Sequence, residues 1–158
     1  MWQGISLWIV IFAALLLICK DRSIELMSLS SDRPLWTRLT FHFVHANMVH
    51  FAINALALLT LSFKVRPESK EWIAAFVLSS TFPFVGEMSV CGLSAMIYAM
   101  LGIRTLYCKD KKNVLTMQLS VIIFGMLLPN IAVGIHLWSY GLGLLWGLLT
   151  VPLSKITQ

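Results

Sequence analysis

The chain has 158 residues, of which 58% are hydrophobic and only 12% are charged, and its mean hydropathy is +0.82. A soluble domain usually carries charge on about a quarter of its residues, so this composition excludes the ordinary soluble fold classes. The net charge of +5 comes from basic residues scattered over short polar breaks, which does not indicate nucleic-acid binding. We therefore expect an all-α protein embedded in a lipid bilayer.

Six apolar stretches predict a polytopic bundle of six membrane-spanning helices in a single domain, residues 1–158. Almost none of them offers a polar face that could meet water. Several are shorter than the ~20 residues that cross a bilayer core upright, which indicates a locally thinned bilayer or helices held among their neighbours. The approximate bounds are Trp2–Cys19, Met48–Phe63, Trp72–Val85, Cys91–Cys108, Val114–Leu128 and Ala132–Leu153.

The first stretch resembles a signal peptide only superficially. No basic residue precedes it and no small-x-small motif ends it, so we expect a retained span. The loop that follows, Lys20–Thr40, contains Trp36 and Arg38, which suit the membrane interface because a ring and a long guanidinium side chain can both be satisfied there. His42 is expected to be another interfacial residue with no catalytic part.

Polar residues gather near the outer end of the second stretch. His50 and Asn54 are four residues apart and therefore share one helix face. We assign His45 a structural role, with its ring hydrogen-bonding the first loop to the helices. A zinc site is the rival use of His45, His50 and His136, but His45 and His50 do not share a face and no carboxylate or cysteine accompanies them. No metal is predicted.

Ser94 and His136 each lie where an apolar helix begins on the same membrane face. Ser94 is three residues into the fourth stretch and His136 is four residues into the sixth. At 1.5 Å rise per residue, each lies ~5 Å below its helix start, so the two side chains share a depth. Small residues at four-residue spacing, Ser139, Gly143 and Gly147, would let the two helices approach closely.

These residue types suit nucleophilic catalysis. A neutral histidine can take the proton of a serine hydroxyl and return it to the leaving amine. No acidic residue lies near His136 in the sequence, so we predict a Ser94/His136 dyad rather than a triad. Tyr98, one turn after Ser94, is expected to pack against the imidazole and fix its orientation.

Attack on an amide carbonyl also requires hydrogen-bond donors for the oxyanion. His50 and Asn54 are predicted to supply a ring N–H and an amide N–H beside the backbone N–H of Ser94. Gly92 and Cys91 would allow close backbone approach at the helix start, with the Cys91 side chain acting as a small packing group.

The loop charges predict the orientation of the chain. With six spans, eight basic residues fall on the side of the termini and four fall on the first loop. The excess of basic residues marks the cytoplasmic side. Both termini are therefore expected in the cytoplasm, with the candidate site opening to the outer face of a membrane such as the bacterial inner membrane.

Together these motifs resemble the rhomboid family of intramembrane serine proteases. The resemblance extends along nearly the whole chain, and no single fragment of it would be specific. It rests on His45-x4-His50-x3-Asn54, Gly92-Leu93-Ser94-Ala95 with Tyr98, Gly134-Ile135-His136, and Trp36 with Arg38 in the first loop.

The resemblance implies a six-helix rhomboid core, the Ser94/His136 dyad and an oxyanion site from His50, Asn54 and nearby backbone. It implies that no cofactor is needed. The partners it implies are transmembrane protein substrates, cut near their outer ends at small residues beside helix-weakening ones. It also makes the fifth span a plausible lateral gate.

Three positions depart from the family pattern: Ala95 and Ser139 stand where glycine is common, and Thr37 separates a tryptophan and an arginine that are usually adjacent. Two other functions stay open at this point. A catalytically inactive rhomboid-like protein would bind or escort transmembrane clients, and a small transporter or channel would also contain buried polar groups. No pattern in the sequence specifies an oligomeric state.

Overall fold

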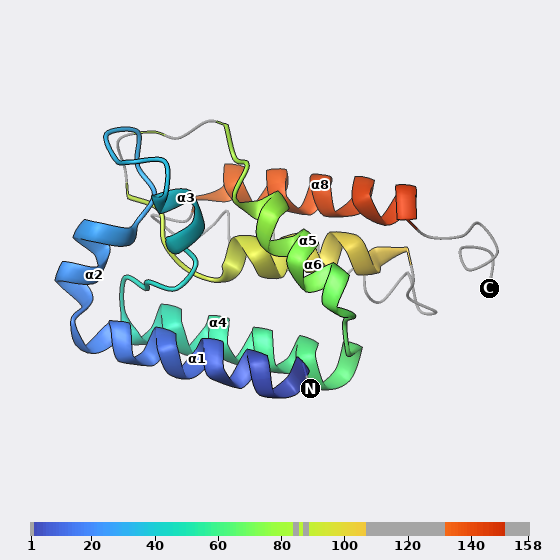
Figure 1. The fold of residues 1–158 in the computed structure, drawn as a ribbon, viewed down its shortest axis with the longest axis horizontal. Helices are drawn as coiled ribbons and strands as arrows, with labels where there is room; N and C mark the ends of the chain where they lie inside the picture. The colour runs from blue at the N-terminus through green and yellow to red at the C-terminus, as the bar shows by residue number, and fades with distance from the viewer. Residues whose placement is uncertain (1, 84–85, 87–88, 107–131, 151–158) are drawn as a thin grey trace.

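The computed structural model describes residues 2–83, 86, 89–106 and 132–150, and over this part the chain is helical (Figure 1). One isolated antiparallel bridge, Leu29–Val90, is the extended pairing found among these residues. The all-helical prediction is thus confirmed. The elements in chain order are α1 (Trp2–Ile18), α2 (Lys20–Met27), α3 (Thr37–Thr40), α4 (Met48–Thr60), the π-helical turn η1 (Leu61–Val65), α5 (Ser69–Ser79), α6 (Ser94–Thr105) and α8 (Val133–Thr150).

Within the described ranges, two helices are long and apolar enough to cross a membrane, Met48–Val65 and Val133–Thr150. A third span is obtained if α1 and α2, which meet at a bend of 109°, are counted together. Helix α5 has 11 residues and α6 has 12, which is roughly 17 Å of helix against a hydrocarbon core of about 30 Å. Six spans are therefore not confirmed. The predicted fifth span, Val114–Leu128, with its expected role as a lateral gate, lies outside the described residues.

Local chemistry explains why α5 and α6 are shorter than the apolar stretches. The hydroxyls of Ser79 and Ser80 both donate to the carbonyl of Phe76, at 3.0 and 2.8 Å, and α5 ends there. Helix α6 begins at Ser94 instead of Cys91 because Gly92 adopts a φ of +114° and its N–H donates to the Phe41 carbonyl at 2.9 Å. Apolar composition alone does not show either boundary.

Helix α6 lies at the centre of the described helices, packed between α5 and α8 (Figure 1). A Cβ built on Gly143 would lie 2.1 Å from the Ala99 carbonyl oxygen, and one on Gly102 would lie 2.2 Å from the Tyr140 carbonyl oxygen. The backbones of α6 and α8 are therefore in direct contact. The small residues predicted for this face, Ser139, Gly143 and Gly147, are all buried.

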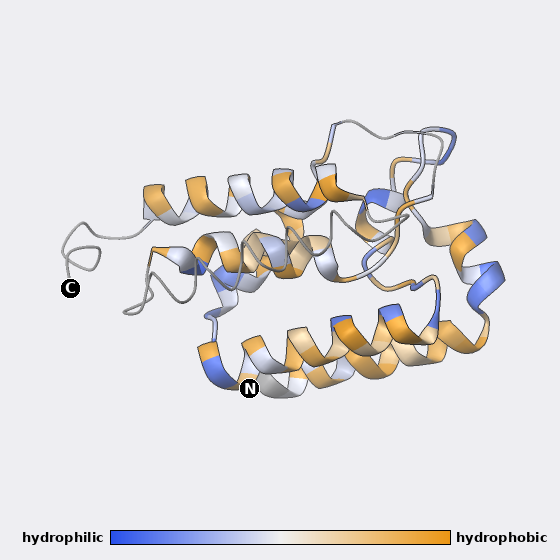
Figure 2. Cartoon of the chain, turned by 180° about the vertical axis from the view of Figure 1, so that it is seen from behind, coloured by the Kyte–Doolittle hydropathy of each residue, from blue (hydrophilic) through white to orange (hydrophobic). Residues whose placement is uncertain are grey.

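Helices α1 and α4 lie side by side and antiparallel, on the other side of α6 from α8 (Figure 1). Figure 2 shows mostly apolar residues along the outward faces of α1, α4 and α8. Trp8 of α1 is 71% exposed and Leu149 of α8 is 77% exposed. Large apolar side chains exposed on this scale suit a lipid environment.

Hydrogen bonds hold the first loop, Lys20–Thr40, against the segment that leads into α6. Leu29 and Val90 exchange both backbone hydrogen bonds, at 2.9 and 2.8 Å, and Ser31 N–H donates to the Gly86 carbonyl at 3.0 Å. The Arg38 guanidinium donates to the Phe82 carbonyl at 2.6 Å, while Trp36 stays half exposed.

His42 is not interfacial, and that prediction was wrong. Its side chain is completely buried, with Nε2 3.2 Å from the Ser80 hydroxyl and its ring 3.9 Å from the Phe41 ring and 5.1 Å from the Phe76 ring. Hydrogen bonding to α5 satisfies one ring nitrogen, and packing against two phenylalanines covers the rest. His42 therefore connects the segment just after the first loop to the end of α5.

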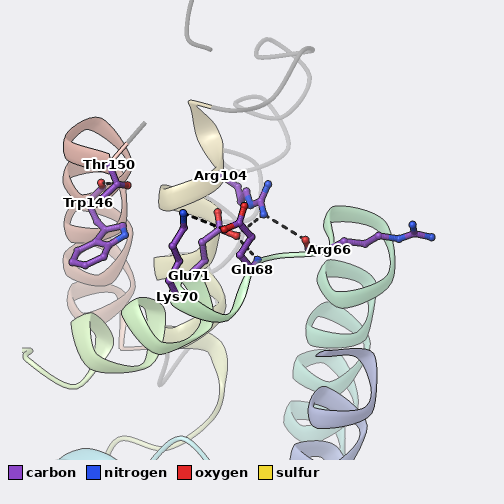
Figure 3. A network of polar contacts seen from close by, with 7 residues as sticks. All are labelled: Arg66, Glu68, Lys70, Glu71, Arg104, Trp146 and Thr150. Carbon is purple, nitrogen blue, oxygen red and sulfur yellow. Dashed lines mark hydrogen bonds and ion pairs between the residues drawn. The ribbon is translucent and has the colours of Figure 1, made fainter. Parts of the chain in front are cut away.

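At the far end of α5 and α6, a network of charges joins the two helices (Figure 3). The buried Glu71 carboxylate accepts a hydrogen bond from the Arg104 guanidinium, which also donates to the Arg66 carbonyl. Glu71 and Glu68 form a capping box at the start of α5, and Lys70 pairs with Glu68 at 3.1 Å.

Candidate active site

Ser94 and His136 meet across the α6–α8 contact. Ser94 is the first residue of α6 and His136 is the fourth residue of α8, and His136 Nε2 lies 2.8 Å from Ser94 Oγ. That distance is a normal hydrogen bond. The glycines about two and three turns further along, Gly102, Gly143 and Gly147, let the two backbones touch, so the close backbone approach sets the distance between the two side chains.

Tyr98 lies against the other side of the imidazole. The rings of Tyr98 and His136 are stacked, with centroids 4.5 Å apart and planes inclined by 15°. Tyr98 comes one turn after Ser94 on α6. The Ser94 hydroxyl and the Tyr98 ring that stacks on His136 are therefore held by the same helix. The imidazole has little freedom to rotate away from Ser94.

The segment that follows α5 contacts the first two turns of α8. Trp138 Nε1 donates to the Thr81 hydroxyl at 3.2 Å, and the Phe82 ring lies within van der Waals reach of Gly134. Since the Phe82 carbonyl accepts from Arg38, the first loop is connected to the helix that carries His136.

His50 and Asn54 converge on the backbone just ahead of Ser94. A Cβ on Gly92 would lie 2.7 Å from His50 Nε2 and 3.2 Å from Asn54 Nδ2. Both side chains therefore reach the Gly92 main chain from α4. Asn54 is 4% exposed, and its Nδ2 has no hydrogen-bond partner among the described residues. A buried, unpaired amide donor is costly, and here it lies beside the segment that ends at Ser94.

His45 is buried, as a structural role requires, but it acts by packing. Its ring lies edge-on to the rings of His50 and Phe51, at centroid distances of 5.2 and 5.4 Å. Neither of its ring nitrogens forms a hydrogen bond of normal geometry within the described residues, and the backbone group that acts on the ring is that of Phe43, beyond the first loop. The hydrogen bond to the first loop that we expected is therefore not found there. Burial lowers the pKa of His45 to about 4, with a smaller contribution from neighbouring His50.

Cys91 is a partly buried free thiol in the extended segment between Val90 and Gly92. Among residues 2–83, 86, 89–106 and 132–150, no three histidine, cysteine or acidic side chains lie close enough to hold a metal ion.

Sequence reasoning missed two contacts beside the site. One is the brace from Thr81 to Trp138, for which the sequence carries no signal. The other is Asn47, whose side-chain oxygen accepts from the His50 N–H at 2.8 Å as the N-cap of α4. An asparagine directly ahead of an apolar helical run is a recognised start signal, so this residue could have been found.

A family model of the rhomboid domain matches residues 32–153, more than three quarters of the chain. The protein belongs to the rhomboid family, as its motifs predicted. Members of this family are generally serine proteases that act within membranes, and the rhomboid domain together with the apolar helices marks an integral membrane protein. A comparison with curated proteins found no match.

Proposed function

We propose that this protein is an intramembrane serine protease, which hydrolyses a peptide bond in or near a transmembrane segment of its substrate. The observation that carries the proposal is the 2.8 Å contact between Ser94 Oγ and His136 Nε2. Family membership supports it, because a nucleophile and a base in hydrogen-bond contact are what a rhomboid protease requires.

In the proposed reaction, Ser94 Oγ attacks the substrate carbonyl carbon while its proton passes to His136 Nε2. The resulting tetrahedral oxyanion accepts hydrogen bonds from the Ser94 backbone N–H, the Asn54 amide and the His50 ring. His136 then gives its proton to the departing amine, and the C–N bond breaks to leave an acyl-enzyme. A water molecule, deprotonated by His136, hydrolyses that ester and restores the Ser94 hydroxyl.

Two supporting roles complete the proposal. The stacked Tyr98 ring keeps the imidazole aligned with Ser94, and the unpaired Asn54 Nδ2 is already desolvated, so it gains most when a negative oxygen forms beside it. The substrate segment must present an unwound carbonyl, because a carbonyl bonded within a helix cannot reach Ser94. Small and helix-weakening residues at the cut would meet that need.

We further propose that the chain is a single domain of six spans, including Val114–Leu128, in a membrane such as the bacterial inner membrane. The distribution of basic residues supports cytoplasmic termini and a site that opens to the outer face.

The test compares purified wild-type protein with Ser94→Ala on a panel of transmembrane reporter substrates and with a fluorophosphonate probe. Ser89→Ala is the matched control, because Ser89 is an exposed serine five residues ahead of Ser94. Cleavage and labelling by wild type and Ser89→Ala, both lost in Ser94→Ala, are expected. Folded wild type that is neither labelled nor able to cleave would instead favour the inactive rhomboid-like protein that escorts membrane clients.

A further inference from the structure

Helix α4 brings His50 and Asn54 to the site, yet several large side chains at its start are exposed, and the His45 ring is the contact described there. Met48 is 65% exposed, Val49 is 68% exposed and Ile53 is 63% exposed. The side of α4 that is buried in the bundle begins at Asn54 and continues with Ala55 and Leu58. The position of His50 therefore depends on local interactions at the start of the helix.

Asn47 supplies such an interaction. Its backbone is extended, with φ −162° and ψ 171°, and its side-chain oxygen accepts from the His50 N–H at 2.8 Å. The Asn47 carbonyl accepts the first helical hydrogen bond, from Phe51 N–H at 3.0 Å. An N-cap of this kind satisfies one of the four N–H groups that a helix start leaves unpaired.

The capped N–H belongs to His50, whose ring approaches Gly92 at the site. His50 is the third residue of α4, and its Nε2 approaches the Gly92 backbone two residues ahead of Ser94. The ring of His45, two residues ahead of Asn47, lies edge-on to the His50 ring, with centroids 5.2 Å apart. A shift of the first turn would therefore move the His50 ring relative to Gly92.

We propose that Asn47 is a positioning residue for the oxyanion site, acting through the His50 N–H to fix the first turn of α4. This role rests on the proposed protease function. Asn47 itself is exposed, so its replacement leaves no cavity, and its effect on turnover would come through His50. Because the oxyanion forms after substrate has bound, the effect falls on kcat and leaves KM unchanged.

The experiment measures kcat and KM on one transmembrane reporter for Asn47→Ala and Asn47→Ser. Loss of the cap in Asn47→Ala should lower kcat by up to about fivefold, the factor by which a typical N-cap favours an ordered first turn, with KM within twofold of wild type. Asn47→Ser, which restores an N-cap oxygen, should recover most of the rate. In a His50→Ala background, Asn47→Ala should change kcat by less than twofold.

Glu68→Ala is the matched control. It removes a cap from the first turn of α5, and Thr81, which contacts Trp138, follows the last turn of that helix. It should therefore lower the melting temperature like Asn47→Ala but leave kcat unchanged. An unaltered kcat in Asn47→Ala, no rescue by serine, or an undiminished effect without His50 would each overturn the positioning role. Wild type that fails to cleave would overturn the protease function itself, and the positioning role with it.

Discussion

Helices α6 and α8 meet backbone to backbone, whereas α4 reaches the same site through the side chains of His50 and Asn54. Three glycines of the first pair leave no room for even a methyl group, so the Ser94–His136 distance follows from the paths of two helices. The His50–Gly92 contact depends on a capped first turn. The proposed nucleophile and base thus rest on rigid packing, and the proposed oxyanion donors rest on local hydrogen bonds that weaker perturbations can disturb.

The largest effect should come from Gly143→Ala, which tests the backbone contact between α6 and α8. The new Cβ would overlap the Ala99 carbonyl at 2.1 Å, so α6 and α8 must separate and Ser94 must move away from His136. We expect activity to fall at least 10³-fold, as when a catalytic group is displaced, together with a lower melting temperature. Gly141→Ala makes the same chemical change on the same helix, where the Cβ meets open space, and should behave like wild type. Equal behaviour of the two variants would rule out the backbone contact as the determinant.

Gly92→Ala tests the approach of the His50 and Asn54 side chains to the backbone ahead of Ser94. Its φ of +114° is unfavourable for alanine, and the Cβ would lie 2.7 Å from the His50 ring. We expect kcat to fall more than the ~10²-fold that one lost oxyanion donor costs, because both His50 and Asn54 are displaced. Labelling by a fluorophosphonate should persist more than cleavage does. Gly86→Ala, in open space, is the control, and a fully active Gly92→Ala would remove this convergence from the mechanism.

Asn54→Ala removes one donor without moving the backbone. We expect a fall in kcat of about 10²-fold, with an unchanged or higher melting temperature because an unpaired buried amide is removed. The measurement is kcat and thermal unfolding of the same preparation. Full activity would exclude Asn54 from the reaction.

The smallest effect concerns the segment just after the first loop, where the Phe41 carbonyl accepts a hydrogen bond from the Gly92 N–H. Burial lowers the pKa of the adjacent His42 to about 3, while an unfolded histidine titrates near 6.5. The unfolded chain therefore binds the proton more readily, and stability is complete above about pH 6.5 and lost as pH falls toward 3, by up to about 1.4 kcal/mol per pH unit. The melting temperature of His42→Gln should fall less than that of wild type between pH 7 and 5. Parallel curves would contradict this assignment.

The helical fold class and the family could both be predicted from the sequence. Apolar stretches indicate the helices, and short motifs indicate the family. It also predicted that Ser94 and His136 lie at one depth, and the structure has them in contact; their catalytic roles stay predictions. The helix boundaries were less accessible, because α5 ends where two serines bond to Phe76 and α6 begins after a left-handed glycine. The burial of His42 could not be predicted, since its partners Ser79 and Ser80 come from a helix more than thirty residues away.

His136 is made 42 residues after the serine that it contacts. At ~5–20 residues per second, a ribosome needs on the order of several seconds to cover that interval. In the proposed protease, a nascent chain that has inserted α6 but not yet α8 carries Ser94 without its partner His136, so it would be unable to cut neighbouring chains in the translocation machinery. Placing the proposed base on the later helix would thus delay the proposed activity until α8 has entered the bilayer.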